Sequence, residues 1–422
     1  MRRPPAVEVV AIGDELILGD TIDTNGAWLG QRLGEEGIRV VRRAVVGDDE
    51  ASIRIAISEA LIRTGIVLCC GGLGPTPDDR TRPVVASIYG WPVEIDEAWV
   101  SIIRDRFAMR GMTMPLVNRQ QAEVPRGAVL LPNEVGTAPG LILDRQGLGI
   151  TVLLPGVPRE LRWLVEHRVL PWLTPKLEQT RSAIHRRVVR TTGLAESAVA
   201  ERIADVSTDL DPLTLAFLPV GIGIDLRLTS WGDIPDDEAN RLLDAAEARI
   251  RERLGRHVYG SGRDDLAEVL GMRLRDRHWT VATAESCTGG LVAKRLTDAP
   301  GSSDYMLGGV TSYANEVKAA VLGVPETTLA QHGAVSERTV QAMLDGIVRL
   351  MHADCAIAIT GVAGPGGGSA DKPVGSVWIA ARTPARNRQR QLSLFGSRAE
   401  IRDRAAQAAL KLLLDMILTE EG

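Results

Sequence analysis

The residues most able to do chemistry in this sequence stand together at 284–290, where Ser286 and Cys287 are both potential nucleophiles. Residues 279–283 are typical of a short strand, and residues 291–296 have the apolar spacing of a helix. We therefore expect a strand-to-helix turn whose unpaired backbone N–H groups suit a phosphate or a developing oxyanion. The alternative is that Ser286 only caps the helix, and this segment alone does not decide between the two.

A serine nucleophile needs a base, and none of the six histidines lies in the neighbouring glycine-rich or polar motifs. The remaining option is a lysine assisted by a tyrosine, and Tyr313 and Lys318 stand where a strand enters a helix. Lys318 would have to be desolvated to accept a proton, and its alternative is a solvated helix lysine. Tyr313 could equally be a half-buried strand aromatic, and Cys287 ranks below Ser286 because it could be a small packing residue.

A second polar constellation, GGLGPTPDDRT at 71–81, follows an apolar strand at 66–70. Its glycines allow close approach of backbone N–H groups to a phosphate. Asp78, Asp79 and Thr81 add oxygen ligands of the kind that Mg²⁺ prefers. The segment is neither a Walker loop nor a dinucleotide fingerprint, and the alternative is a turn with solvated aspartates.

The elements that must position these groups alternate along the chain. Residues 7–12, 38–46 and 66–70 are typical of strands, and helices are expected from Asn25 and over 50–63. This βαβαβ order predicts a parallel sheet covered by helices, whose ligands gather at the carboxyl ends of the strands. The loops at 13–15, 71–81 and 155–158 are expected there.

Two breaks in the pattern divide the chain. Prolines at 171–175 and the Gly-Ser-Gly segment at 260–262 separate two larger α/β regions from a small α/β unit. The last region closes on an amphipathic helix over 401–416. We therefore predict domains at 1–174, 175–258 and 259–422.

Composition restricts the class of protein. The 422 residues are 45% hydrophobic and 24% charged, with a net charge near −5 and only 4% aromatic residues, so neither nucleic acid nor a membrane surface is an expected partner. Four cysteines without C-x-x-C spacing argue against a zinc knuckle or a disulfide framework and favour the cytoplasm. No apolar stretch approaches the roughly 20 residues of a membrane span.

The motifs at 13–16, 23–25, 71–81, 118–122, 133–140 and 155–160 resemble the N-terminal half of the CinA family of competence/damage-inducible proteins. The resemblance implies a molybdopterin-binding-like three-layer α/β/α domain that acts as an ADP-ribose pyrophosphatase with a divalent metal (Mg, Co or Mn). Asp14, Asp78 and Asp79 would lie at the metal. Leu73 replaces the threonine of the G-G-T-G motif, so pterin binding is not implied. The residues that would contact the nucleotide are Asn25, Gly71, Gly72, Gly74, Thr76, Thr81, Asn133 and Thr137.

The A-E-S-C-T-G-G motif, the Y-x-N-E-x-K run and the loop after Thr360 resemble the C-terminal domain of the same family. That resemblance implies an α/β nicotinamide mononucleotide (NMN) amidohydrolase without a cofactor, which releases nicotinate mononucleotide and ammonia. Ser286 would attack, Lys318 with Tyr313 would move the proton, and N–H groups at 288–290 would stabilise the oxyanion. The residues that would contact this substrate are Glu285, Thr288, Gly289, Gly290, Asn315, Thr360, Gly361, Gly364, Arg398 and Arg402.

The whole chain thus resembles a bifunctional enzyme of pyridine-nucleotide recycling. The alternative is a binding or scaffold protein associated with competence or DNA damage, with one active catalytic half or none. Between the halves we expect a KH-like middle domain, which could serve a homodimer because it has no site of its own. Pro219 and the Gly-Ile-Gly segment at 221–223 depart from the plain strand pair expected there.

Overall fold

The computed structural model describes residues 6–177, 183–232 and 234–420. They fall into two compact units, one within Met1–His185 and Ser230–Asn240, the other within Arg186–Thr229 and Arg241–Gly422. The fold is α/β in each of its three regions, as the sequence predicts.

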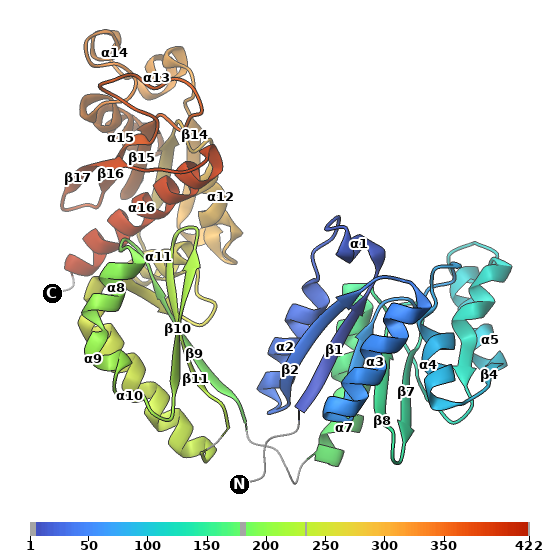
Figure 1. The fold of residues 1–422 in the computed structure, drawn as a ribbon. Coiled ribbons are helices and arrows are strands. Elements are labelled where there is room, and N and C mark those ends of the chain that lie inside the picture. The colour runs from blue at the N-terminus through green and yellow to red at the C-terminus, as the bar shows by residue number, and fades with distance from the viewer. Residues whose placement is uncertain (1–5, 178–182, 233, 421–422) are drawn as a thin grey trace. The chain divides into compact units, whose positions relative to one another are not determined.

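The first unit is built on a six-stranded sheet of order β2-β1-β3-β8-β7-β6 (Figure 1). Its first four strands are parallel, and β7 and β6 add to one edge in antiparallel pairing. The strands are β1 (Ala6–Ile12), β2 (Arg39–Val46), β3 (Ile66–Cys70), β6 (Val129–Leu131), β7 (Gly140–Arg145) and β8 (Gly149–Leu154). A separate two-stranded sheet pairs β4 (Val93–Ile95) with β5 (Glu123–Pro125).

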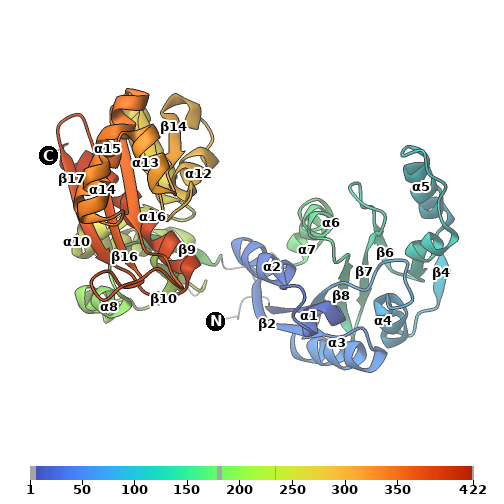
Figure 2. The same ribbon diagram turned by 90° about the horizontal axis from the view of Figure 1, so that it is seen from above.

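Helices cover both faces of this sheet (Figure 2). In β1, Val7 and Val9 join a core with Leu29 of α2, whereas Val10 joins a second core with Ile53 of α3. Burial on both faces is why the strand is apolar throughout instead of alternating. The helices are α1 (Asp14–Ile17), α2 (Thr24–Glu35), α3 (Glu50–Thr64), α4 (Thr81–Tyr89), α5 (Glu97–Ala108), η1 (Leu116–Ala122), α6 (Pro158–Leu164), η2 (Val165–Val169) and α7 (Leu170–Leu177).

The middle region has a four-stranded sheet of order β10-β11-β9-β12. Strands β10 (Thr214–Val220) and β11 (Gly223–Ser230) form a regular antiparallel hairpin. Pro219 therefore lies in an edge strand, where its missing N–H costs no ladder bond. The remaining elements are β9 (His185–Thr191), α8 (Glu196–Arg202), α9 (Ala204–Ser207), α10 (Asp236–Leu254), η4 (Gly255–His257) and β12 (Val258–Ser261).

The C-terminal region has a five-stranded sheet of order β14-β13-β15-β16-β17. The first three strands are parallel, so β13 and β14 both deliver their next residues to the same edge. The strands are β13 (Val281–Glu285), β14 (Met306–Thr311), β15 (Cys355–Gly361), β16 (Ser376–Arg382) and β17 (Asn387–Ser393).

Two cores flank this sheet. Ile357 and Ile359 of β15 pack with α11, α12 and α16, whereas Ala356 and Ala358 face α15. The small side chains on the second face allow α15 to lie close to the sheet. The helices are α11 (Leu266–Asp276), α12 (Leu291–Asp298), η5 (Ser302–Asp304), α13 (Asn315–Leu322), α14 (Glu326–His332), α15 (Glu337–Met351) and α16 (Arg398–Thr419).

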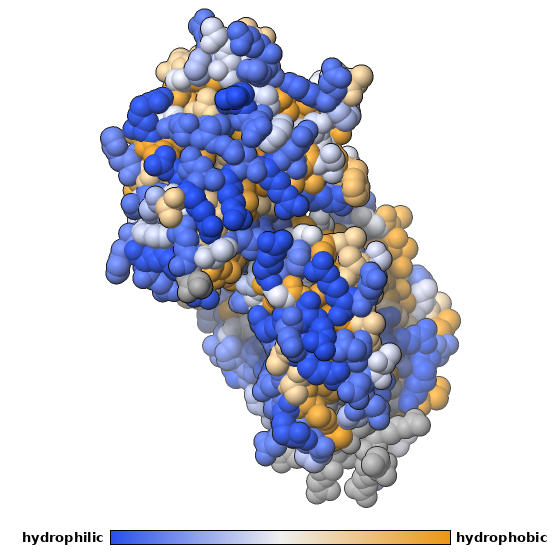
Figure 3. Space-filling model, turned by 90° about the vertical axis from the view of Figure 1, so that its left-hand side faces the viewer, coloured by the Kyte–Doolittle hydropathy of each residue, from blue (hydrophilic) through white to orange (hydrophobic). Residues whose placement is uncertain are grey.

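The face drawn in Figure 3 is mostly hydrophilic, with apolar side chains in small groups between the polar ones. Among the described helices, none combines the length and the apolar character of a transmembrane segment.

Candidate active sites

Ser286 stands directly after β13, in the turn that the sequence predicts. Its N–H donates to the Ile359 carbonyl of the neighbouring strand at 3.0 Å, and its own carbonyl accepts from the Gly289 N–H at 3.1 Å. Gly289 and Gly290 have φ values of 63° and 90°, which reverse the chain into α12. The serine is therefore held at the carboxyl edge of the sheet with 8% of its surface exposed.

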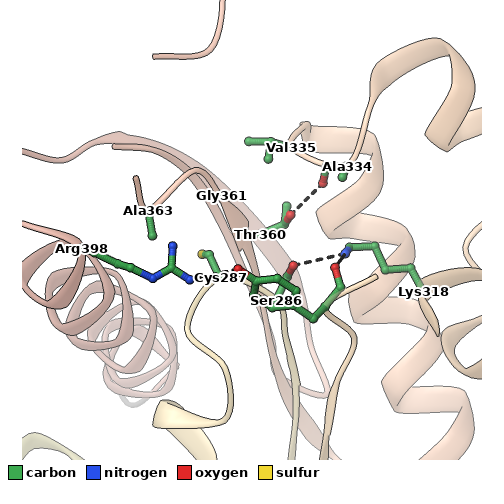
Figure 4. Close-up of a pocket in the computed structure, with 10 residues that line it drawn as sticks. Ser286, Cys287, Lys318, Ala334, Val335, Thr360, Gly361, Ala363 and Arg398 are labelled. Carbon is green, nitrogen blue, oxygen red and sulfur yellow. Dashed lines mark hydrogen bonds between the residues drawn. The ribbon is translucent and has the colours of Figure 1, made fainter. Parts of the chain in front are cut away.

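Lys318 on α13 is 1% exposed and points its amine at this serine (Figure 4). Its Nζ lies 3.2 Å from Ser286 Oγ, 2.8 Å from the Ser312 carbonyl and 3.0 Å from the Tyr313 carbonyl. Burial lowers the pKa of the Lys318 amine below that of an ordinary lysine. A neutral amine has two N–H donors and one lone pair, so with both donors on the two carbonyls the lone pair is free to accept the serine proton.

A cavity of about 190 Å³ opens over this pair. Its charged lining residues are Lys318 and Arg398, and no described lining residue is acidic. Arg398 donates to the Tyr313 hydroxyl at 2.9 Å and to the Gly364 carbonyl at 2.7 Å. The lining residues are Ser286, Cys287, Tyr313, Lys318, Ala334, Val335, Thr360, Gly361, Ala363 and Arg398. A cationic cavity over a serine suits an anionic substrate whose carbonyl reaches Ser286 Oγ.

The predicted role of the Tyr313 side chain in the proton relay needs correction, and the low rank given to Cys287 as a nucleophile has a physical reason. The Tyr313 hydroxyl is bonded to Arg398, and only the Tyr313 backbone carbonyl touches Lys318. Cys287 lines the cavity, but burial raises the pKa of its thiol to about 11, which keeps it protonated near neutral pH. Neither side chain competes with Lys318 and Ser286 for the central role.

Several predicted substrate contacts lie outside the cavity lining. The Glu285 carboxylate is bonded to backbone N–H groups of α12, and Arg402 donates to the Thr288 carbonyl at 2.7 Å. Asn315 is exposed at the start of α13. The residues that do not line the cavity are Glu285, Thr288, Gly289, Gly290, Asn315, Gly364 and Arg402. Of these, Glu285, Gly289 and Arg402 bond the backbone of the turn or of the start of α12.

Sequence reasoning missed Ser312, which is fully buried between β14 and α13. Its N–H donates to the Glu285 carbonyl at 2.8 Å, and its carbonyl accepts from Lys318. The contact with Lys318 comes from the Ser312 backbone, while its hydroxyl donates to the Glu285 carbonyl at 3.4 Å, so its side-chain type gave no sign of a contact with the lysine.

A second cavity, of about 400 Å³, lies in the first unit where β1, β3 and β8 end. Gly71, Gly72, Gly74, Thr137, Asp78 and Asp79 line it, as predicted for the nucleotide and metal site. Five lining residues are acidic, namely Glu15, Asp48, Asp78, Asp79 and Glu160, and no described lining residue is a lysine or arginine.

The Gly71–Thr81 segment is a loop closed on itself. A Cβ on Gly72 would lie 2.1 Å from Thr81 Oγ1, and Gly72 has φ 64°, so only glycine fits there. The Asp79 carboxylate accepts from the Gly74 N–H at 2.6 Å and the Thr76 N–H at 2.8 Å. Asp79 therefore shapes the loop with its carboxylate and also lines the cavity.

Asp14 has a partner that the sequence did not indicate. The Asp14 N–H donates to the Asp48 carboxylate at 2.9 Å, and the Asp48 N–H donates to the Asp14 carboxylate at 3.1 Å. Burial, and then the charges of Asp14, Glu15 and Asp78, raise the pKa of Asp48. The carboxylates are close enough to repel one another, which is the environment that a cation relieves.

The donor set fits a hydrated cation better than one enclosed by protein ligands. In the described part of the chain, no three His, Cys, Asp or Glu side chains are grouped to hold one metal ion. Mg²⁺ commonly keeps several waters and uses only one or two carboxylates together with substrate phosphates. The exposed Asp78 lines the cavity and is able to supply such a carboxylate, whereas Asp14 is exposed but not among the lining residues and reaches the site through its bonds to Asp48.

The other predicted contacts of this site support loops. Asn133 is fully buried and bonds the Ala138 carbonyl at 2.8 Å and Glu160 at 2.6 Å. Thr81 is also buried, and its hydroxyl donates to the Gly71 carbonyl at 3.1 Å. Asn25 donates to the Gly156 carbonyl at 2.7 Å, and Thr76 serves the Asp79 loop. These residues shape the cavity wall without lining it.

Comparison with known proteins covers the same regions. A family model described as "CinA C-terminal domain" matches residues 263–417, one described as "Probable molybdopterin binding domain" matches 8–175, and "Damage-inducible protein CinA KH domain" matches 186–260. A CinA-like protein of Gemmatimonas aurantiaca is 46% identical over 99% of this chain and 97% of its own length. A CinA-like protein of Chloroherpeton thalassium is 40% identical over 97% of this chain and 99% of its own length. A crystal structure of a CinA superfamily protein from Klebsiella pneumoniae is 36% identical, covers 36% of this chain and 96% of its own, and has a TM-score of 0.36.

Proposed function

This chain belongs to the CinA family, and we propose that it is a bifunctional hydrolase of pyridine-nucleotide breakdown products. Its C-terminal site would hydrolyse the carboxamide of NMN to a carboxylate and ammonia. Its N-terminal site would cleave the pyrophosphate of ADP-ribose with a divalent cation. The observation that carries the proposal is the buried Lys318 amine, which lies 3.2 Å from Ser286 Oγ and bonds no described carboxylate.

The amidase step follows from that geometry. Ser286 Oγ attacks the carboxamide carbon while its proton passes to Lys318 Nζ. The Lys318 ammonium returns the proton to the carboxamide nitrogen, and the C–N bond breaks. Ammonia leaves, and the acyl group stays on Ser286 Oγ as an ester. Water then attacks the ester with Lys318 again as base, which releases the carboxylate and restores the serine hydroxyl.

The surrounding groups would orient the substrate. The Gly289 N–H is already bonded to the Ser286 carbonyl, so we assign the oxyanion to the N–H group of Cys287, which lines the cavity. The cationic Arg398 and the loop from Gly361 suit the substrate phosphate. Thr360 donates its hydroxyl proton to the Ala334 carbonyl at 2.7 Å and thereby holds the opposite wall.

The N-terminal site would work differently. Its acidic lining repels a bare pyrophosphate, so the site would need a divalent cation (Mg²⁺, Mn²⁺ or Co²⁺), which Asp78 of the lining and the neighbouring Asp14 would hold. When bound, such an ion neutralises phosphate charge and polarises the reacting phosphoryl group. The protein's own part is the backbone cradle of 71–74, which the Asp79 bonds keep in shape.

All four cysteines are buried free thiols, which supports our proposal that the protein acts in the reducing cytoplasm.

The test measures both activities in one preparation. Wild-type protein should release ammonia from NMN, and Ser286→Ala should lose at least about 1,000-fold of that rate while it still cleaves ADP-ribose with added cation. Undiminished deamidation by Ser286→Ala would refute the nucleophile. Absence of ADP-ribose cleavage with Mg²⁺, Mn²⁺ and Co²⁺ would refute the N-terminal assignment.

A further inference from the structure

Glu285 is a buried carboxylate that forms an ion pair with none of the described cationic residues. It is the last residue of β13, immediately before Ser286, and none of its surface is exposed. No ion pair to a described lysine, arginine or histidine compensates it. A carboxylate in such a place is costly unless other groups stabilise its charge.

The start of α12 supplies that stabilisation. The Glu285 carboxylate accepts from the Ala293 N–H at 2.8 Å and from the Val292 N–H at 3.1 Å. The N-cap residue of α12, Gly290, has no side chain to satisfy these donors. Backbone donors and the positive end of the helix dipole therefore face the charge together.

The contact closes the nucleophile turn into a ring. Glu285 precedes the turn and Val292 follows it, so the carboxylate ties together the two ends of residues 286–291. The Glu285 carbonyl also accepts from the Ser312 N–H at 2.8 Å, and the Ser312 carbonyl accepts from Lys318 Nζ at 2.8 Å. One residue is thus connected to both members of the serine–lysine pair.

We propose that Glu285 is a positioning residue, whose carboxylate clamps the turn to α12 and thereby holds Ser286 Oγ within bonding distance of Lys318 Nζ. The inference rests on the proposed amidase function. Glu285 does not line the cavity, so its effect should fall on the rate of the chemical step and leave substrate binding nearly unchanged. A displacement of about 1 Å in such a pair costs on the order of 100-fold in rate.

The variant Glu285→Gln keeps the size of the side chain but replaces one acceptor oxygen by an amide donor that faces another N–H. We expect kcat for NMN to fall about 10- to 100-fold and KM to stay within about threefold. Glu285→Asp keeps the charge but has a shorter side chain. It should also lower kcat and leave KM nearly unchanged, and it serves if the glutamine variant does not fold. The matched control is Asp96→Ala, which removes a side-chain cap from α5, where Asp96 accepts from the Trp99 N–H at 2.8 Å; it should lower Tm with unchanged deamidation.

A second assay tests the role of Glu285 without NMN as the substrate. The rate of acylation of Ser286 by p-nitrophenyl acetate, followed by mass spectrometry, should fall in parallel in Glu285→Gln. Acylation of wild-type Ser286 without ammonia release from NMN would refute the proposed substrate and leave the positioning role standing. Wild-type kcat and acylation in folded Glu285→Gln and Glu285→Asp would overturn the positioning role, as would a loss confined to KM.

Discussion

The two cavities of this protein occupy equivalent places in their sheets and carry opposite charge. Both open at the carboxyl ends of parallel strands, beside a turn that contains glycines with positive φ. The C-terminal cavity is lined by Lys318 and Arg398 and by no described acid, whereas the N-terminal cavity is lined by five acids and no described base. The same α/β framework thus presents two chemistries, because the side chains at the strand ends, and not the fold, set the charge.

The difference in lining charge predicts how each site would bind an anionic nucleotide. The C-terminal site has Arg398 as a cation and Lys318 as a buried base, so under the proposed function we expect it to work without an added ion. Under the proposed function, the N-terminal site should bind phosphates only when a cation neutralises its carboxylates. Each prediction below acts on one side of this contrast.

Removal of the C-terminal base should have the largest effect. Lys318→Met keeps the length and the apolar stem of the side chain but removes the proton acceptor. We expect ammonia release from NMN to fall about 100- to 10,000-fold, while cleavage of ADP-ribose stays at the wild-type rate. Equal losses in both assays would mean that the variant perturbs the fold and not the base.

Removal of divalent cations should inactivate the N-terminal site and leave the C-terminal site active. EDTA followed by buffer exchange should reduce ADP-ribose cleavage by at least about 100-fold, because cation charge stabilisation contributes several kcal/mol. Deamidation of NMN should be unchanged, and added Mn²⁺ or Mg²⁺ should restore only the first activity. Loss of deamidation on chelation would show that the C-terminal site also depends on a cation.

The pH dependence should mark the buried amine. Burial lowers the pKa of Lys318 from the ordinary lysine value, and only the neutral amine accepts the serine proton. The rate of deamidation should therefore increase about tenfold per pH unit until the pH reaches the pKa of Lys318, which lies below about 10.4, and should level off above it. A kcat/KM profile that is flat from pH 6 to 9 would argue against Lys318 as the base.

The structural role of Asp79 predicts a smaller, two-part effect. Asp79→Asn loses at least one acceptor of the loop bonds to Gly74 and Thr76. The free energy of unfolding of the first unit should drop by about 1–3 kcal/mol, and ADP-ribose cleavage should fall with it. Asp78→Asn at the exposed neighbouring position should raise the cation concentration needed for cleavage without lowering Tm. Thermal melts and cation titrations of both variants distinguish the two roles.

Tyr313→Phe should have the smallest effect. Its hydroxyl contacts Arg398, and its contribution to Lys318 comes from the backbone. The loss of one partly exposed hydrogen bond is worth about 1 kcal/mol, or roughly fivefold in KM for NMN, with kcat within a factor of about two. A large fall in kcat would restore the tyrosine to the proton relay.

The regular elements of both larger regions follow from local pattern. The strand predicted at 66–70 is β3 (Ile66–Cys70), and the helix predicted at 50–63 is α3, which ends one residue later. Local pattern assigns no element to residues 82–149, which contain most of α4, all of α5 and the strands β4 to β7. There, β4 pairs with β5 about 30 residues further along the chain, and no local pattern specifies such a pairing.

The reactive pair was identifiable as residue types but not as a contact. Ser286 and Lys318 are 32 residues apart and meet because β13 and β14 are adjacent parallel strands that end at one edge. Arg398 reaches the same cavity from α16, 85 residues after Tyr313. The order of motifs along the chain did not indicate these distances.

The sequence by itself determined which polar residues stand at the strand ends, and that the chain has the motifs of the CinA family. Only the tertiary structure decided which of them face a cavity: the Glu285 carboxylate turns to backbone N–H groups of α12 and lies outside the cavity lining, whereas Lys318 lines its cavity beside Ser286. The physical reason is that burial and hydrogen-bond partners belong to the packed chain. A carboxylate is a ligand or a clamp according to which donors the fold leaves unsatisfied around it.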